Sequence, residues 1–427
     1  MSNDNTKAIL STLAVGAAGA SALSYLYKTS KNMTWTSFFA NNSESLEYYL
    51  LAGDIGGTNS RLSLYCSSCQ KTPLYENEYL NSQHITDASK TFEVEIFNHF
   101  LSECPIAWND HTAIVACFAV AGPVNKNCVV MTNLGGHHTS AKKVDPTRME
   151  VKIDGNSIES SDHGFIRYIK KCKVVNDFVG QGYGLLDLDL DREVVELVPG
   201  SRAMIDPNGV KACAGAGTGL GQCFLTQSSF HPEDGYECFA SEGGHVDFVP
   251  RTELEYGLLN FLKEKFEQNH RVSVERVVSG KGLANVYEYL AKTHSDLVNT
   301  EVHEEFVNAT DMQGRVVGVN ANNESNPDPL CVQAMEIMMS AYGSEVGNCA
   351  VKFIPTGGLF VSGGLTPKNI KFIQGSDSPF MKAYMDKGRL ATLLEGVPLF
   401  AVLVQDLGLR GARVCALRVS ATLLPTF

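Results

Sequence analysis

The sequence has little basic charge for its size. Its 427 residues contain 35 Lys and Arg against 47 Asp and Glu, a net charge of −12. Because the phosphate backbone of nucleic acids requires a basic face, this balance argues against general nucleic-acid binding. Hydrophobic residues make up 44% of the chain and charged residues 19%, which argues against a mainly disordered or fibrous protein.

The twelve cysteines lack the spacing of a small disulfide-stabilised domain. They are scattered from Cys66 to Cys415, which indicates a reducing compartment. Cys66 and Cys69 form a Cys-x-x-Cys pair, but neither a second pair nor histidines follow at the spacing of a zinc site. We therefore interpret this pair as two thiols at strand ends, with zinc binding as the weaker alternative.

No charged residue occurs in the twenty-residue stretch from Ala8 to Tyr27. Its length would span a bilayer, but Ala, Gly and Ser dilute its hydrophobicity. A marginal membrane anchor, a signal peptide and an Ala-rich arm therefore all stay open. We expect residues 1–45 to form an N-terminal extension and the protein to be cytoplasmic, either free or weakly tethered to a membrane through residues 8–27.

Apolar runs and amphipathic segments alternate after residue 46. Strands are expected within Tyr49–Ala52, Thr112–Val120, Lys173–Val175, Gly358–Ser362 and Val397–Val404, and helices within Thr91–Leu101, Leu254–Phe266 and Met335–Phe353. The polar segments 145–164 and 320–329 predict surface loops. This order predicts two α/β domains around a cleft, a smaller one of residues 46–187 plus 403–427 and a larger one of residues 188–402.

The first glycine-rich turn, Asp54-Ile-Gly-Gly-Thr-Asn59, lies between two strand-like segments. Glycines let backbone N–H groups approach phosphate oxygens, and Thr58 adds a hydroxyl donor. Asp54 is suited to hold Mg²⁺ through water. The turn is not a Walker P-loop, since no Gly-Lys-Ser/Thr follows. Taken alone, a structural hairpin is the more common interpretation.

Two further glycine turns follow strand-like segments. Gly215 to Gly221 has Thr218 at its centre, and Gly363-Gly364 would suit packing against an adenine or a ribose. Each turn alone is a weak signal. Two such turns in successive α/β units favour the phosphate-binding interpretation.

Candidate catalytic and ligand-binding side chains follow these segments. Asn176-Asp177 ends a strand, where a carboxylate can act as a base towards a hydroxyl, while a helix N-cap is the alternative. Glu242 and His245 offer the acceptors and donors that sugar hydroxyls need, although a metal site would lack a third ligand. Glu275 interrupts an apolar run, and its alternative is an exposed helix residue paired with an arginine.

Seven ordered motifs resemble the bacterial-type glucokinase family of the sugar-kinase, Hsp70 and actin superfamily, from Leu51 to Leu417. They are Gly53-Asp-Ile-Gly-Gly-Thr-Asn59, Met131-Thr-Asn133, Asn176-Asp-Phe178, Gly215-Ala-Gly-Thr-Gly-Leu-Gly221, Glu242-Gly-Gly-His-Val-Asp-Phe248, Val274-Glu-Arg-Val-Val-Ser-Gly-Lys-Gly-Leu283 and Gly363-Gly364. The resemblance implies an α/β fold with two ribonuclease H-like (actin-like ATPase) domains flanking a substrate cleft.

The resemblance also implies an activity, the phosphorylation of the glucose 6-hydroxyl by ATP with Mg²⁺, as the first step of glycolysis. Asp177 would be the catalytic base, and Asp54 would lie near Mg²⁺ through water. The sugar would contact Asn133, Asn176, Asp177, Glu242, His245 and Glu275. ATP would contact Gly53, Asp54, Ile55, Gly56, Gly57, Thr58, Asn59, Gly217, Thr218, Gly219, Gly363 and Gly364. Family members are commonly dimers, so we expect a homodimer.

Two alternative functions stay open. One is a kinase for another hexose or an amino sugar, of a related repressor–kinase family whose Cys-rich zinc motif we do not find. The other is a non-catalytic glucose sensor, whose expected mark would be the loss of the base at Asp177. Residues 1–45, 145–164 and 292–330 exceed the family pattern, but none of them contains a motif.

Overall fold

The structure is a computed structural model that describes residues 48–69, 71–87, 89–134, 149–227 and 235–421. The expectations for residues 1–45, and for a membrane segment at 8–27, lie outside these ranges. Within the ranges, no helix combines the length and the hydropathy that crossing a membrane requires.

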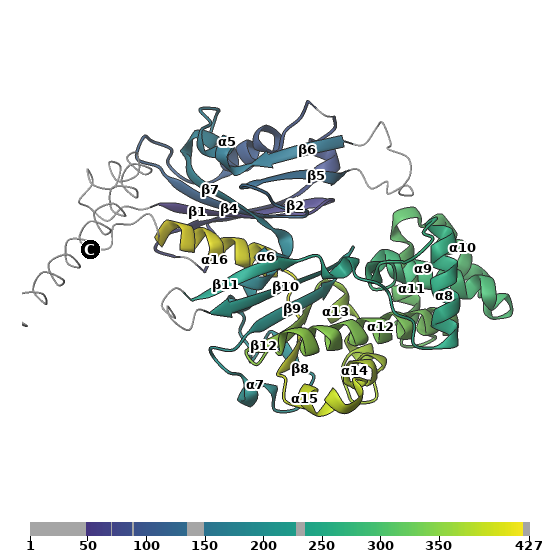
Figure 1. Cartoon of the computed structure of the whole chain (residues 1–427). Helices are drawn as coiled ribbons and strands as arrows, with labels where there is room; N and C mark the ends of the chain where they lie inside the picture. Colours follow the sequence, from purple (N-terminus) through teal and green to yellow (C-terminus); the bar gives the residue numbers. More distant parts are fainter. Residues whose placement is uncertain (1–47, 70, 88, 135–148, 228–234, 422–427) are drawn as a thin grey trace, which may run out of the picture.

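Two mixed β-sheets repeat the same strand order (Figure 1). The first sheet runs β3 (Tyr75–Leu80), β2 (Asn59–Cys66), β1 (Tyr49–Ile55), β4 (Ile114–Val120) and β7 (Ile169–Asn176). The second runs β11 (Tyr236–Ser241), β10 (Leu220–Gln227), β9 (Lys211–Ala216), β12 (Gly358–Ser362), β13 (Leu399–Val402) and β8 (Val194–Glu196). In both sheets an antiparallel meander of three strands is followed by two parallel strands. The α/β fold and the strand–turn–strand units around the first two glycine turns are therefore confirmed.

The expected loop at 145–164 is wrong for its described part. Strand β6 (Met149–Asp154) pairs with β5 (Cys128–Leu134), and α5 (Gly155–Glu159) follows directly. Val151 and Ile153 are buried on alternate positions of β6, so a period of two underlies the polar composition. Asp154 then caps α5 by accepting hydrogen bonds from two backbone N–H groups of its first turn.

Two helices lie between the sheets. Helix α16 (Leu407–Ala421) packs on β1 and β4 of the first sheet, and α6 (Asp177–Gly184) contacts strands of both sheets (Figure 1). The two helices touch backbone to backbone, because a Cβ atom at Gly411 would lie 1.6 Å from the carbonyl oxygen of Gly180. Smaller helical segments of the first half are α3 (Asn81–His84), η1 (Glu93–Asn98) and α4 (His99–Glu103).

Helices cover the other face and one end of the second sheet (Figure 1). They are α7 (Ser201–Met204), α8 (Glu253–Lys265), α9 (Gly280–Thr293), α10 (Thr300–Asn308), α11 (Gln313–Ala321), α12 (Pro329–Phe353), α13 (Leu365–Lys368), α14 (Pro379–Met385) and α15 (Ala391–Glu395). Single 3-10 turns are η2 (Ile166–Tyr168), η3 (Leu185–Asp187), η5 (Gly243–His245), η6 (Val274–Arg276), η7 (Ser295–Leu297), η8 (Thr310–Met312), η9 (Ile370–Phe372) and η10 (Gly388–Leu390).

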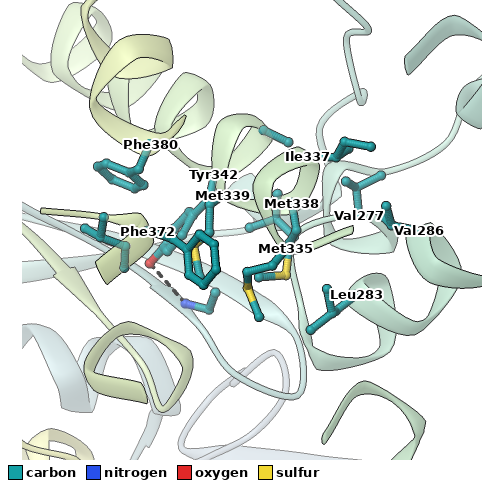
Figure 2. Packing of buried hydrophobic residues seen from close by; sticks show 14 of the residues in the cluster. Val277, Leu283, Val286, Met335, Ile337, Met338, Met339, Tyr342, Phe372 and Phe380 are labelled. Carbon is teal, nitrogen blue, oxygen red and sulfur yellow. Dashed lines mark hydrogen bonds between the residues drawn. The ribbon is translucent and has the colours of Figure 1, made fainter. Parts of the chain in front are cut away.

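Helix α12 forms the centre of the larger hydrophobic core. Met335, Met338 and Tyr342 are fully buried on it and face α9 and α14 (Figure 2). This confirms that the methionine and aromatic stripe is part of the hydrophobic core.

The expected loop at 320–329 is also present. It is shortened at both ends, because α11 ends at Ala321 and α12 begins at Pro329. The domain boundaries at residues 187/188 and 402/403 stay a prediction.

Candidate active site

The turn between β1 and β2 is held by a residue that the sequence motif does not contain. The N–H of Gly56 donates to the carbonyl of Asn59 at 2.9 Å. Asn81, which is buried, donates to the carbonyl of Gly56 at 2.8 Å through its side chain and to the carbonyl of Thr58 at 2.8 Å through its N–H. In the described part of the chain, the N–H groups of Gly57 and Thr58 donate no hydrogen bond. They are therefore free to bind an anion.

Asp54 lies at the end of β1, against the first turn of α16. A Cβ atom at Gly408 would lie 2.8 Å from the carboxyl carbon of Asp54, so the helix backbone approaches this carboxyl directly. Burial raises the pKa of Asp54 to about 6, while the charge of Arg61 acts in the opposite direction. A nearby positive charge stabilises the ionised form of a carboxyl that is buried in this way.

Asn176 and Asp177 lie where β7 ends and α6 begins. Asn176 is the N-cap, because its Oδ1 accepts from the N–H of Phe178 at 2.9 Å and its Nδ2 donates to the carbonyl of Gly122 at 3.1 Å. Asp177 Oδ1 accepts from the same N–H at 3.0 Å. The capping interpretation is thus confirmed for Asn176, and it leaves the second carboxylate oxygen of Asp177 for other partners.

The pKa of Asp177 is raised to about 7, mainly by burial and then by the negative charges of Asp54 and Glu242. The hydrogen bond from the N–H of Phe178 opposes this rise. Asp54 and Asp177 belong to the first sheet and to α6, whereas Glu242 follows β11 of the second sheet. The structure therefore brings three carboxyl groups from both halves of the molecule within electrostatic range of one another.

The turn between β9 and β10 is also closed by an internal backbone hydrogen bond, but it is one residue shorter than the first turn. The N–H of Gly217 donates to the carbonyl of Gly219 at 2.8 Å. Thr218 is exposed at its tip, and in the described residues the N–H groups of Thr218 and Gly219 have no acceptor. A Cβ atom at Gly217 would meet no atom within 4 Å, so the space beside this turn is open.

Phe178 docks the start of α6 onto this second hairpin. A Cβ atom at Gly221 would lie 2.0 Å from the Phe178 ring, and one at Gly215 would lie 3.1 Å from it. These two glycines face each other across β9 and β10. Since Phe178 follows Asp177 in the chain, the contact holds the start of α6 against the strands that flank the second turn.

Three predicted sugar-binding side chains come from neighbouring segments. Glu242 precedes η5 and His245 is its last residue; Glu242 Oε2 lies 3.9 Å from His245 Nε2, and the two side chains are 69% and 60% exposed. The chain after η5 pairs with the chain before η6 through N–H donation from Phe248 to Val272 at 2.8 Å and from Val274 to Val246 at 2.8 Å. This pairing brings Glu275 beside η5.

Glu275 is not the exposed, arginine-paired helix residue that the alternative interpretation required. It is half-buried, and its Oε2 accepts from the N–H of Leu220 at 2.9 Å. Asn133 lies on β5, and its side chain is outside the described part of the structure.

The third glycine turn touches the second. Gly363 has a φ of +84°, and a Cβ atom there would lie 2.3 Å from the carbonyl oxygen of Ala216. Only glycine avoids both the strained backbone and the clash. Ser362 donates to Gln181 of α6 at 2.9 Å, which ties this turn to the helix that carries Asp177. The third turn thus contacts both the second turn and α6.

The sequence reasoning missed several supporting residues. Two of them are Asn81 and Gly408. The others form a buried pair, in which Gln222 donates to Glu345 at 2.9 Å beneath η5.

Within the described residues, no group of three or more His, Cys, Asp and Glu side chains could hold a metal ion, and Cys66 and Cys69 belong to no such group. A cavity of about 630 Å³ between α11 and α14 is lined by none of the site residues.

Comparison with known proteins decides the family. The model of the family described as Glucokinase matches residues 51–152 and 158–419. The chain belongs to the glucokinase family. A glucokinase from Synechocystis sp. is 35% identical over 86% of this chain and 97% of its own length. A glucokinase from Hahella chejuensis is 31% identical over 85% of this chain and 95% of its own.

A solved structure has the same fold. A glucokinase from Balamuthia mandrillaris, crystallised in complex with glucose, superposes with a TM-score of 0.68 at 21% identity, covering 91% of this chain and 98% of that one. The predicted fold, two actin-like ATPase domains, is therefore confirmed, as is the resemblance to the glucokinase family.

Proposed function

We infer that the protein is an ATP-dependent glucokinase, which transfers the γ-phosphoryl group of ATP to the 6-hydroxyl of glucose, the first step of glycolysis. Membership of the glucokinase family supports the reaction. The observation that carries the mechanism is the position of Asp177, a carboxyl of raised pKa beside two glycine turns with free N–H groups. This reaction needs a hydroxyl that accepts the phosphoryl group, a base that takes the proton of that hydroxyl, and a site that binds the phosphates.

Asp177 acts as the general base. Its free carboxylate oxygen takes the proton of the 6-hydroxyl as the hydroxyl oxygen bonds to the γ-phosphorus, and the bond from that phosphorus to the β,γ-bridging oxygen breaks. Glucose 6-phosphate and ADP result. A base with a pKa of about 7 is about half ionised at neutral pH and is basic enough to hold the proton. Most of the rate comes from aligning the two reactants.

The two glycine turns bind the phosphates of ATP. The N–H groups of Gly57 and Thr58 from one side, and of Thr218 and Gly219 from the other, face a negatively charged ligand without losing any internal bond. The whole ATP-binding set is Gly53 to Asn59, Gly217 to Gly219 and Gly363-Gly364. The last pair lies against the second turn and packs on the ribose or adenine.

Asp54 fits Mg²⁺, although it belongs to no cluster of three ligands. Mg²⁺ is commonly held by one or two carboxylates, retained waters and the phosphates of a nucleotide. Asp54 offers the carboxylate, and burial beside other carboxyl groups gives it a deficit of positive charge. When bound, Mg²⁺ supplies positive charge that neutralises the phosphates.

The remaining hydroxyls of the sugar contact Asn133, Asn176, Glu242, His245 and Glu275. Asn176 has one amide proton and one lone pair left after its two internal bonds. Glu242 and His245 are exposed enough to meet a ligand directly. The same donors and acceptors would also suit another hexose or an amino sugar, which is therefore the alternative substrate.

The test is a coupled assay of glucose 6-phosphate formation with Mg-ATP, for the parent chain and Asp177→Asn. The substitution is expected to lower kcat by about 10³-fold while glucose still binds in calorimetry. Asp162→Asn, at an exposed site, is the matched control. If the parent binds glucose without turnover, the glucose-sensor alternative replaces the proposed enzyme. If it phosphorylates mannose, fructose or N-acetylglucosamine faster than glucose, that sugar replaces glucose as the proposed substrate.

We further propose that the enzyme works as a homodimer in the reducing cytoplasm. All twelve cysteines are free, which fits a reducing compartment. Light scattering of the purified chain tests the dimer. Deletion of residues 1–45 tests the tether. Unchanged turnover together with loss of membrane association would mean that residues 8–27 localise the enzyme and take no part in catalysis.

A further inference from the structure

The backbone of Leu220 touches both candidate sugar-binding segments. Its N–H donates to Glu275 Oε2 at 2.9 Å, and its carbonyl oxygen lies where a Cβ atom at Gly244 would come within 1.8 Å. Leu220 is the first residue after the turn Gly217 to Gly219, which we assign to phosphate. One residue of the second hairpin thus contacts η5 and η6 at the same time.

The other end of that turn is held by the same segment as Glu275. The carbonyl of Gly217 accepts from the N–H of Gly280 at 2.8 Å, and the hydroxyl of Ser279 donates to the carbonyl of Glu275 at 2.8 Å. The turn is therefore clamped at both ends by residues 275–280. Any shift of Glu275 changes one of the two clamps.

Glu275 has one carboxylate oxygen in use and one free. In the described residues, Oε1 of Glu275 has no hydrogen-bond partner, whereas Oε2 holds the N–H of Leu220. The residue is half-buried beside η5, which carries His245. A carboxylate has two equivalent oxygens in one rigid plane, so fixing one of them fixes the other.

We propose that Glu275 couples the two substrate sites: Oε1 binds a hydroxyl of glucose while Oε2 holds the second phosphate turn, so that glucose and ATP bind with positive cooperativity. This inference rests on the proposed function. Sugar binding orders the carboxylate, the ordered carboxylate strengthens its charge-assisted bond to Leu220, and the ordered turn presents its N–H groups to phosphate. Coupling of this kind is reciprocal, so each ligand raises the affinity for the other by one common factor.

The test is calorimetry on the full chain with Mg²⁺, using glucose and the non-hydrolysable ATP analogue AMPPNP. In the parent, each ligand is expected to raise the affinity for the other by the same factor, about 5- to 20-fold. Glu275→Ala should weaken glucose binding and reduce that factor to about 1. Glu275→Asp, one methylene shorter, should also lose the coupling because it reaches only one of the two partners.

Glu242→Ala is the matched control, since Glu242 is assigned to the sugar and, within the described residues, its side chain makes no hydrogen bond or ion pair with the turn. It should weaken glucose binding and leave the coupling factor unchanged. A coupling factor of 1 in the parent, or a parental factor in both Glu275 variants, would overturn the inference. Turnover is measured separately: no glucose 6-phosphate from the parent defeats the proposed function, while turnover with unaltered coupling defeats only this inference.

Discussion

The β1–β2 and β9–β10 hairpins occupy the same place in their sheets, but only the first carries a charged side chain beside its turn. Counting back from each turn, Asp54 of β1 corresponds to Gly215 of β9. Asp54 meets the backbone of α16. At Gly215, by contrast, the missing side chain makes room for the Ser362 hydroxyl and the Phe178 ring, which would lie 2.4 Å and 3.1 Å from a Cβ atom there. One scaffold thus serves two purposes: the first hairpin supplies negative charge, and the second positions the helix that bears Asp177.

The two turns also differ in how they are held. The first is braced by Asn81, an uncharged residue from the same sheet edge. The second is clamped by Glu275 and Gly280, which belong to the candidate sugar side. The first turn is therefore set independently of the sugar, while the second is tied to the sugar site.

The largest expected effect comes from removing the negative charge that the second hairpin lacks. Asp54→Asn should lower kcat/KM by about 10³-fold, because the site loses the carboxylate assigned to Mg²⁺. Thr218→Ala in the second hairpin should lower it only about tenfold, since one hydroxyl hydrogen bond to a phosphate is lost while the backbone N–H groups are kept. Steady-state kinetics over a range of Mg²⁺ measures both. Equal losses in the two variants would contradict the division of labour between the turns.

The second prediction concerns packing of the second hairpin. Gly221→Ala should destabilise the fold by about 2–3 kcal/mol, because the new methyl overlaps the Phe178 ring that docks α6. Gly217→Ala, four residues earlier in an open space, should stay within about 0.5 kcal/mol of the parent. Urea denaturation measures both variants. A neutral Gly221→Ala would show that Phe178 does not fix α6 on this hairpin.

The hairpins themselves could be predicted from the sequence, because each glycine turn lies between apolar runs of strand period. The same reasoning failed for β6, where the alternate buried residues Val151 and Ile153 stand among charged neighbours. It also favoured neither interpretation of Asn176-Asp177: the helix N-cap is observed at Asn176, while the base at Asp177 stays a prediction.

The residues that support the site had no local signal. Asn81 reaches the first turn from 25 positions along the chain, and Gly408 meets Asp54 from the far end of the sequence. Glu345 lies in the middle of an apolar helix and finds Gln222 only through folding. Such contacts depend on how two sheets and two crossing helices are assembled, and no spacing within one segment encodes that assembly.

The third prediction uses the electrostatic link between the hairpins. Because Asp177 must be ionised, kcat/KM should rise about tenfold per pH unit below its pKa of about 7 and level off above it. The negative charge of Asp54 contributes to that high pKa. The residual activity of Asp54→Asn should therefore level off at lower pH than the activity of the parent. An unmoved profile would mean that the two carboxyl groups do not interact.

The smallest effect is on stability, and its sign follows from the same carboxyl group. The pKa of Asp177 in the fold, about 7, exceeds its ordinary value of 3.8. The folded state then holds the proton more tightly than the unfolded chain, so stability is lost as pH rises from about 4 to about 7.

Asp177→Asn removes this loss, because the amide does not ionise. The variant should therefore gain stability over the parent as pH rises from about 4 to about 7 and keep that gain at higher pH, while it loses turnover. Denaturation at several pH values measures the gain, and Asp162→Asn provides a curve that should run parallel to the parent. A gain at every pH would point to packing as its cause. A gain confined to the higher pH values would assign it to the ionisation of the buried Asp177 carboxyl.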